Sequence, residues 1–200
     1  MKTAQRSLLD RHQLSASLAD RRARHLLACL HDGPATVRDL TVALAATERD
    51  CARSAVTNAD QRQYRHQLDH HYLPGLRAVG LLTQSADGFV RSVPGTLDQF
   101  EVQFPPLDEP DHADWAAATA VVGRAYRYPL VSAVAECESI SLSRLADRLA
   151  GTDGRWTSSP RDLAIALHHA DLPKLAAVDL LTYDAESRAV AHTPGTDAVL

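Results

Sequence analysis

The chain is poor in the residues that define several classes of protein. Its 200 residues include three cysteines, Cys29, Cys51 and Cys137, which are far apart and odd in number. That excludes a disulfide scaffold and indicates reduced thiols in a cytoplasmic compartment. No uncharged apolar run approaches the ~18 residues of a membrane span, and Trp115–Val122 is one of the longest. Residues 1–13 lack the apolar core of a signal peptide, so we expect a cytoplasmic protein with no membrane partner.

Lysine is nearly absent, and arginine supplies 19 of the 21 basic residues. Hydrophobic residues make up 45% and charged residues 23% of the chain, as in an average soluble globular protein, which excludes a disordered or collagen-like chain. The formal net charge of −4 is unevenly distributed. Residues 1–96 carry 13 basic and 9 acidic residues, a net +4, whereas residues 97–200 carry 8 and 16, a net −8. Only the first part is therefore suited to a polyanion.

The sequence contains an internal repeat. LPGLRAVGLLT, which begins at Leu73, and LPKLAAVDLLT, which begins at Leu172, are identical at eight of eleven positions. Upstream of them, VRDLTVALA and LSRLADRLA match in the same order. The repeat predicts two copies of one fold of about 80 residues. We expect domains over residues 1–96 and 114–200, joined by an acidic, proline-containing linker over 97–113 whose aromatic residues pack against one of them.

Local signals predict the elements of each copy. In copy one, a polar capping residue with a polar partner three positions later occurs at Ser17, Thr36 and Asn58, and each such pair predicts the start of a helix. Asp32-Gly33-Pro34 ends the first of these helices. In copy two, the third helix begins at Ser159, which is followed by a proline at the first helical position.

The third helix of each copy is followed by a hairpin. Pro74 and Pro173 fall inside these helices, and each is expected to kink its helix or to split off a short last segment. Asp87-Gly88 between two β-rich runs predicts a hairpin. The order is helix, extended link, helix, helix and hairpin. The predicted fold is mainly α with small β-hairpins (α+β), built as two tandem winged helix-turn-helix domains. Apolar residues at helical spacing predict the inner faces of the third helices: Tyr64, Leu68, Tyr72, Leu76 and Val79, and Leu163, Leu167, Leu172, Leu175 and Val178.

Three segments together resemble a known family. LADRRARHLLACLHDG, VRDLTVALA and HHYLPGLRAVGLL are similar to a winged-helix domain of unknown function that is abundant in haloarchaea. The resemblance covers copy one over about 16–93, and copy two over about 114–193, where it is good from Leu163 onward and poor in the first helix. It implies an archaeal, cytoplasmic, DNA-binding protein of transcription regulation, sometimes with two copies in one chain.

The third helix of copy one is the predicted DNA contact. In a helix-turn-helix this helix enters the major groove, and arginine there pairs with guanine or phosphate. The expected DNA-binding residues are Arg62, Arg65, His66, Asp69 and His70 on that helix, with Arg91 on the wing and Arg21 and Arg22 on the first helix. The alternative is that these are ordinary solvated charges on an amphipathic helix, since Asp69 lies among the arginines.

Copy two lacks most of this charge. The matching positions are Arg161, Ala164, Ile165, His168 and His169, too few cations to neutralise several phosphates. We expect Ile165, His168 and His169 to form an interaction surface that orients or dimerises the protein, although burial of Ile165 within its own domain is equally consistent with the sequence.

The remaining motifs do not indicate catalysis or a cofactor. His66 and His70 are spaced as a metal pair would be, but no acidic residue lies between them and no cysteine pair is near, so no metal is expected. The chain has no phosphate-binding glycine loop and no hydrolase motif, and 151–154 is expected to be a turn. We therefore predict a non-enzymatic regulator that binds duplex DNA and can form a homodimer; the alternative is a protein-interaction module built on winged helices that no longer bind DNA.

Overall fold

The computed structural model describes residues 2–151 and 159–200, and side chains from Arg11 onward. The chain forms two compact units: Met1–Gln99 with Pro105–His112, and Phe100–Phe104 with Ala113–Leu200. The segment expected to be a linker is thus divided between them. Most of the turn expected at 151–154 lies outside the described residues. No helix in the described part of the chain combines the length and apolarity needed to cross a bilayer.

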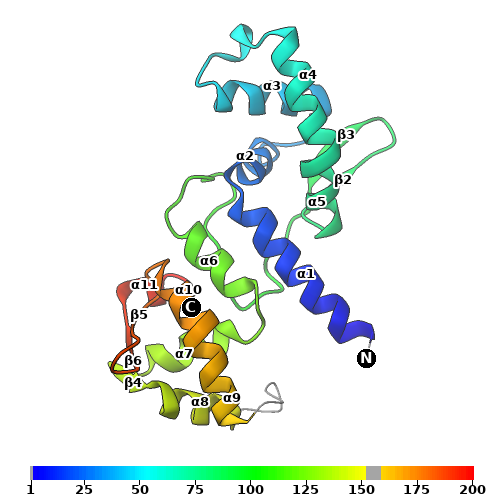
Figure 1. The fold of residues 1–200 in the computed structure, drawn as a ribbon. Coiled ribbons are helices and arrows are strands. Elements are labelled where there is room, and N and C mark those ends of the chain that lie inside the picture. The colour runs from blue at the N-terminus through cyan, green and yellow to red at the C-terminus, as the bar shows by residue number, and fades with distance from the viewer. Residues whose placement is uncertain (1, 152–158) are drawn as a thin grey trace. The chain divides into compact units, whose positions relative to one another are not determined.

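The first unit has a helical body and a small sheet (Figure 1). Its elements, in chain order, are α1 (Lys2–Ala19), α2 (Arg21–Cys29), β1 (Ala35–Thr36), α3 (Val37–Glu48), a 3-10 turn η1 (Arg53–Ala55), α4 (Asn58–Gln67), η2 (Leu68–Tyr72), α5 (Leu73–Ala78), β2 (Leu82–Gln84) and β3 (Phe89–Ser92). The strands are antiparallel in the order β1-β3-β2. Val90 of β3 is fully buried and pairs with both neighbouring strands, so it joins the hairpin to the helical core.

The second unit repeats this order. Its elements are α6 (Trp115–Val122), α7 (Arg127–Ala135), β4 (Ser139–Ser141), α8 (Leu142–Ala150), α9 (Pro160–Ala166), η3 (Leu167–Asp171), α10 (Leu172–Ala176), β5 (Leu181–Asp184), β6 (Ala189–His192) and α11 (Pro194–Asp197). The strands are antiparallel in the order β4-β6-β5, with Val190 fully buried. As predicted, Ser159 caps α9 and a proline follows it. The predicted packing of the linker aromatics is confirmed, because the rings of Phe104 and Trp115 lie 6.2 Å apart within this unit.

The repeat extends to individual backbone conformations. A left-handed residue follows the last helical segment before the hairpin in both units, Gly80 with φ 76° and Asp179 with φ 56°. Another lies at the hairpin turn, Gly88 with φ 86° and Arg188 with φ 54°. The predicted fold class, mainly helical α+β in two repeated units, is confirmed.

The helix predicted as the third of each copy begins as α4 or α9, the fourth helix of its unit, and keeps the name third helix; it runs through a wide π turn, formed by η2 or η3. Leu73 donates its N–H to the carbonyl of Leu68, five residues back, and the equivalent bond is made in the second unit. The turn lies directly before Pro74 and Pro173, because proline has no N–H and its ring collides with the carbonyl four residues earlier in a regular helix. The predicted short last segments are confirmed as α5 and α10.

Two helix starts were predicted at the wrong residue, those of α4 and of the first helix. The cap of α4 is Thr57 rather than Asn58, since the Thr57 hydroxyl accepts the N–H of Asp60 and the Asp60 carboxylate accepts the N–H of Thr57. This reciprocal pair lies one residue before the predicted pair and uses a carboxylate, a stronger acceptor than the amide of Gln61. The capping box predicted at Thr36 is confirmed.

The first helix does not start at Ser17. Ser17 lies inside α1, a helix that was not predicted from the sequence, whose Leu14 and Leu18 are buried. The chain leaves helical geometry at Asp20, whose carboxylate accepts the N–H of Arg22 at 2.9 Å and caps α2. Asp20 is therefore a cap in its own right rather than the partner of an earlier one.

A buried ion pair joins the helices of the second unit. The Arg127 side chain is 5% exposed and that of Asp171 is 2% exposed, and Arg127 Nε donates to Asp171 Oδ1 at 2.9 Å. The Tyr126 hydroxyl donates to the other carboxylate oxygen at 2.9 Å, and Arg127 Nη1 donates to the carbonyl of Ala120 at 2.7 Å. The network thus links α6, α7 and η3.

Removal of the buried carboxylate tests this network. Asp171→Ala leaves the Arg127 charge buried without its partner, and we expect the free energy of unfolding to fall by about 3–5 kcal/mol. Glu136→Ala is the matched control, because Glu136 pairs with Arg148 at the surface and such pairs contribute about 1 kcal/mol or less. Urea unfolding followed by circular dichroism measures both, and similar losses in the two variants would contradict the role given to Asp171.

Candidate nucleic-acid interface

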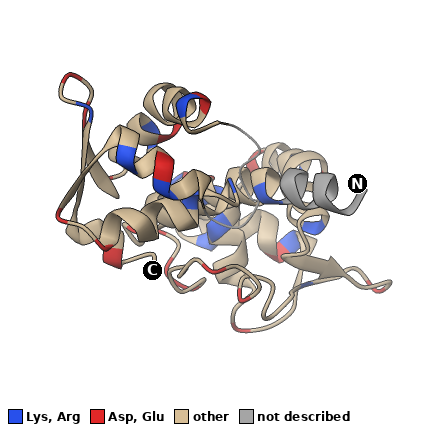
Figure 2. Ribbon diagram, turned by 90° about the horizontal axis from the view of Figure 1, so that it is seen from below, with Lys and Arg blue, Asp and Glu red and all other residues tan. Residues whose placement is uncertain are grey.

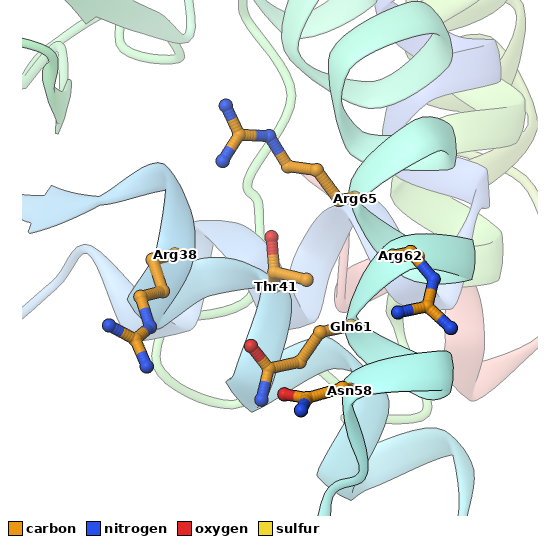
Figure 3. Close-up of a pocket in the computed structure, with 6 residues that line it drawn as sticks. All are labelled: Arg38, Thr41, Asn58, Gln61, Arg62 and Arg65. Carbon is orange, nitrogen blue, oxygen red and sulfur yellow. The ribbon is translucent and has the colours of Figure 1, made fainter.

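Three arginines surround one surface hollow between α3 and α4. The hollow has a volume of about 350 Å³ and is lined by Arg38 and Thr41 of α3 and by Asn58, Gln61, Arg62 and Arg65 of α4 (Figure 3). Arg38, Arg62 and Arg65 are all exposed. The structure therefore brings together the predicted pair on α4 with an arginine of α3 that sequence reasoning missed. Arg38 lies in the first turn of α3, the helix before α4, and this position in the sequence is the signal that could have identified it.

Intramolecular pairing differs among these arginines. Arg65 Nε donates to Asp69 Oδ2 at 2.5 Å, one turn along the helix, and both side chains are exposed. Such a surface pair contributes little and exchanges readily with solvent or a ligand. Within the described residues, neither Arg38 nor Arg62 makes an ion pair with a carboxylate. These two guanidinium groups are therefore available to an anion without the breaking of an existing pair.

The start of α4 is fixed by the acidic residue in its cap. Hydrogen bonds from Thr57, and then the Arg49 guanidinium, lower the pKa of Asp60 below its ordinary value. Because Arg49 follows α3 and Asp60 lies in the first turn of α4, this contact connects the end of one helix to the beginning of the next. The contact therefore helps to hold the first turn of α4 beside the end of α3.

The two predicted histidines lie together on the exposed side of the third helix. The rings of His66 and His70 are 4.5 Å apart between centroids, and both residues are exposed. They do not line the hollow. In the described ranges, no three His, Cys, Asp or Glu side chains gather in a way that would hold a metal ion.

Arg91 and its neighbour Phe89 lie on the hairpin rather than at the hollow. Arg91 is exposed on β3, opposite Thr83 of β2, while the residue between Phe89 and Arg91 is buried. Phe89 is 38% exposed. The hairpin therefore presents one cation and one apolar side chain to solvent.

Arg21 and Arg22 are engaged within the first unit. Arg21 Nε donates to Asp111 Oδ1 at 2.6 Å, which raises the pKa of Arg21 and lowers that of Asp111. Arg22 Nε donates to Glu48 Oε2 at 2.7 Å, and this carboxylate, followed by Tyr72, raises the pKa of Arg22. Arg22 thus connects α2 with α3 and does not line the hollow. That both arginines flank a duplex stays a prediction.

The equivalent face of the second unit has a different character. Its hollow, of about 290 Å³, is lined by Leu142, Arg161, Ala164, Ile165, His168, His169 and Arg188. Ile165 is 53% exposed, so its burial within its own unit is ruled out. His168 is half-buried and bonds through Nδ1 to the Tyr183 hydroxyl. Arg188 was not predicted from the sequence, because it comes from the hairpin turn and not from the helix.

The difference in net charge between the two parts of the chain does not arise from long blocks of one sign. Basic and acidic positions are interspersed along the ribbon (Figure 2). What distinguishes the first unit is therefore the local grouping of three arginines around one hollow.

Two copies of one mainly helical unit thus define this protein, and the first copy carries the arginine-lined hollow. A family model described as "Domain of unknown function (DUF7344)" matches residues 16–91 and 121–191. These stretches make up more than half of the chain, which therefore belongs to this family and contains its domain as a tandem pair. No curated protein and no solved structure matches the chain.

The contacts of Arg22 predict a role in stability. Arg22→Ala removes the ion pair with Glu48, and we expect a loss of about 1 kcal/mol in the free energy of unfolding, since the guanidinium is partly exposed. Arg21→Ala, which removes a pair exposed on both sides, is expected to cost less. If Arg22 instead serves a duplex surface, its removal would leave urea unfolding unchanged and weaken duplex binding.

Proposed function

We propose that the protein is a DNA-binding transcriptional regulator whose first unit is a winged helix-turn-helix. The observation that carries the proposal is the group of three exposed arginines around the hollow between α3 and α4. In a helix-turn-helix the second helix of the pair lies in the major groove while the first crosses the phosphate backbone. On this assignment α4 reads the groove and Arg38 of α3 contacts phosphate.

The polar residues of α4 suit base recognition as well as phosphate contact. Arginine pairs bidentately with guanine, and asparagine or glutamine pairs with adenine, in the major groove. Asn58 and Gln61 lie at the N-terminal end of α4 and line the same hollow as Arg62 and Arg65. Recognition residues at the N-terminal end of such a helix are the ones that reach base edges. We propose these four side chains as the direct readout.

The hairpin and the net charge support the same proposal. The β2–β3 hairpin follows the third helix, as a wing does, and Arg91 is exposed on it. Residues 1–96 carry a net +4, which attracts a polyanion over a distance of about one Debye length. The resemblance to haloarchaeal winged-helix regulators also supports this function and a cytoplasmic, archaeal setting.

We propose that the second unit orients or dimerises the protein rather than reading DNA. The third helix of the second unit has Ala164 and Ile165 at the positions that Arg65 and His66 occupy in the first unit. The exposed Ile165, with His168 and His169, is the proposed contact. A two-fold protein would suit a two-fold operator.

Duplex binding against salt tests the proposed DNA contact. The operator is obtained by selection from random duplexes, and affinity is then measured by fluorescence anisotropy between about 50 and 200 mM salt. We expect a steep loss of affinity as salt rises. Arg62→Gln and Arg38→Gln should each reduce the salt slope by about 0.9 for each phosphate that is no longer neutralised, and Arg65→Glu should abolish binding.

Arg77→Gln is the matched control for these variants. Arg77 is an exposed arginine of α5 that does not line the hollow, so its removal should leave affinity and salt slope near those of the wild type. The proposal fails if the wild type does not bind any duplex at low salt, or if Arg77→Gln weakens binding as much as Arg62→Gln does.

A protein-interaction module is the second candidate function. It is favoured by the exposure of Phe89, at 38%, on the hairpin and of Ile165, at 53%, on the third helix of the second unit. Exposed apolar side chains at these positions serve a protein partner better than a phosphate backbone. Absence of duplex binding at low salt, with association that depends on Phe89 or Ile165, is the result that would select this function.

A further inference from the structure

The hollow of the second unit combines cations with an apolar lining. Arg161 comes from α9 and Arg188 from the turn between β5 and β6, and both are exposed beside the same hollow. Neither makes an ion pair with a carboxylate in the part of the chain that the structure describes. Two cations from separate elements thus converge in the part of the chain whose net charge is −8. An anion at this site would neutralise both.

Arg188 occupies a backbone conformation that favours glycine. Its φ is 54°, and the equivalent residue of the first unit is Gly88, with φ 86°. A side chain at positive φ strains the backbone, and glycine avoids that strain. Residues in strained backbone conformations persist where the surrounding structure holds them, and they cluster at functional sites. The arginine that stands here in place of glycine adds a cation beside the hollow of the second unit.

The lining between the two arginines is apolar. Leu142 is buried at the start of α8, Ala164 is half-buried, and Ile165 is 53% exposed, the most exposed of the large hydrophobic side chains described. A bound molecule with an apolar body would cover Ile165 and remove that surface from water, and would therefore compete with the proposed dimer contact for the same side chain. The bond between His168 and Tyr183 fixes one imidazole ring beside the hollow.

We propose that this hollow binds a small organic anion, a carboxylate with a short apolar body. Arg161 and Arg188 would bind the carboxylate, as arginine does bidentately, and Ile165 and Leu142 would contact the apolar part. The volume, about 290 Å³, lies at the lower end of the range of ligand pockets and excludes a large ligand. A nucleic-acid backbone fits less well, because alanine and isoleucine replace Arg65 and His66 of the first unit on this face.

Calorimetric titration of the full chain with hexanoate and benzoate tests the site. We expect saturable binding of these acids at millimolar concentration or below, and no binding of hexylamine, which has the same apolar body and the opposite charge. Arg161→Gln and Arg188→Gly should each weaken hexanoate binding by about tenfold or more, since each removes a charge-assisted bond. Arg144→Gln, an exposed arginine of α8 outside the hollow, should leave it unchanged.

Arg188→Gly separates binding from folding. Glycine relieves the positive-φ strain, so the melting temperature without ligand should stay the same or rise while hexanoate binding is lost. A wild-type response to hexanoate in this variant overturns the proposal.

The other probes decide between ligand classes, independently of the proposed DNA contact. Hexanoate binding that is unchanged by Arg62→Gln shows that the site is separate from the α4 face. The organic-anion assignment is overturned if inorganic phosphate binds as tightly as hexanoate, or if a duplex binds through Arg161 and Arg188.

Discussion

The wide turn in the third helix is the constraint on which the rest of each unit depends. Buried side chains recur every four residues, at positions 68, 72 and 76 after the half-buried position 64 in the first unit, and at 163, 167, 171 and 175 in the second; Leu73 and Leu172 are buried beside this row. In a regular helix such a row drifts around the axis by about 40° at every step, because a turn has 3.6 residues. The π segment before Pro74 or Pro173 widens one turn and opposes this drift. The row therefore stays against the core, and α4 or α9 presents its opposite side to solvent.

The same constraint explains how the two units have diverged. Position 72 is a buried tyrosine, whereas the equivalent position 171 is a buried aspartate that is bonded to Tyr126 and Arg127. The partners of Asp171 lie at the start of α7, so the backbone of the two units is retained while the polar atoms at this position change. On the solvent side no such pairing is imposed. There Arg65 and His66 correspond to Ala164 and Ile165, and Gly88 corresponds to Arg188, so the two faces suit different ligands.

Local chemistry made part of this structure predictable. Ser159 before a proline, the capping pair at Thr36 and the glycine of the hairpin turn each satisfy a backbone requirement within a few residues, and each was predicted correctly. The cap of α4 was misplaced because Thr57 and Asn58 are adjacent and both are good caps. Helix α1 was missed because the burial of Leu14 and Leu18 depends on packing against other helices. Arg38 and Arg188 were missed for the same kind of reason, since each joins its hollow from a different element.

The segment between the two family matches has a consequence for the boundaries of the units. Residues 100–104 belong to the second unit, whereas residues 105–112, which come later in the chain, belong to the first, where Asp111 meets Arg21 and the Pro110 carbonyl accepts from Arg24. Cleavage of one peptide bond therefore cannot release both units whole. A cut before residue 100 separates the first unit from residues 105–112, which contain Asp111, the partner of Arg21. A cut after residue 112 separates the second unit from residues 100–104, which contain Phe104. The two units therefore have no single boundary in the sequence, because their segments alternate between residues 99 and 113.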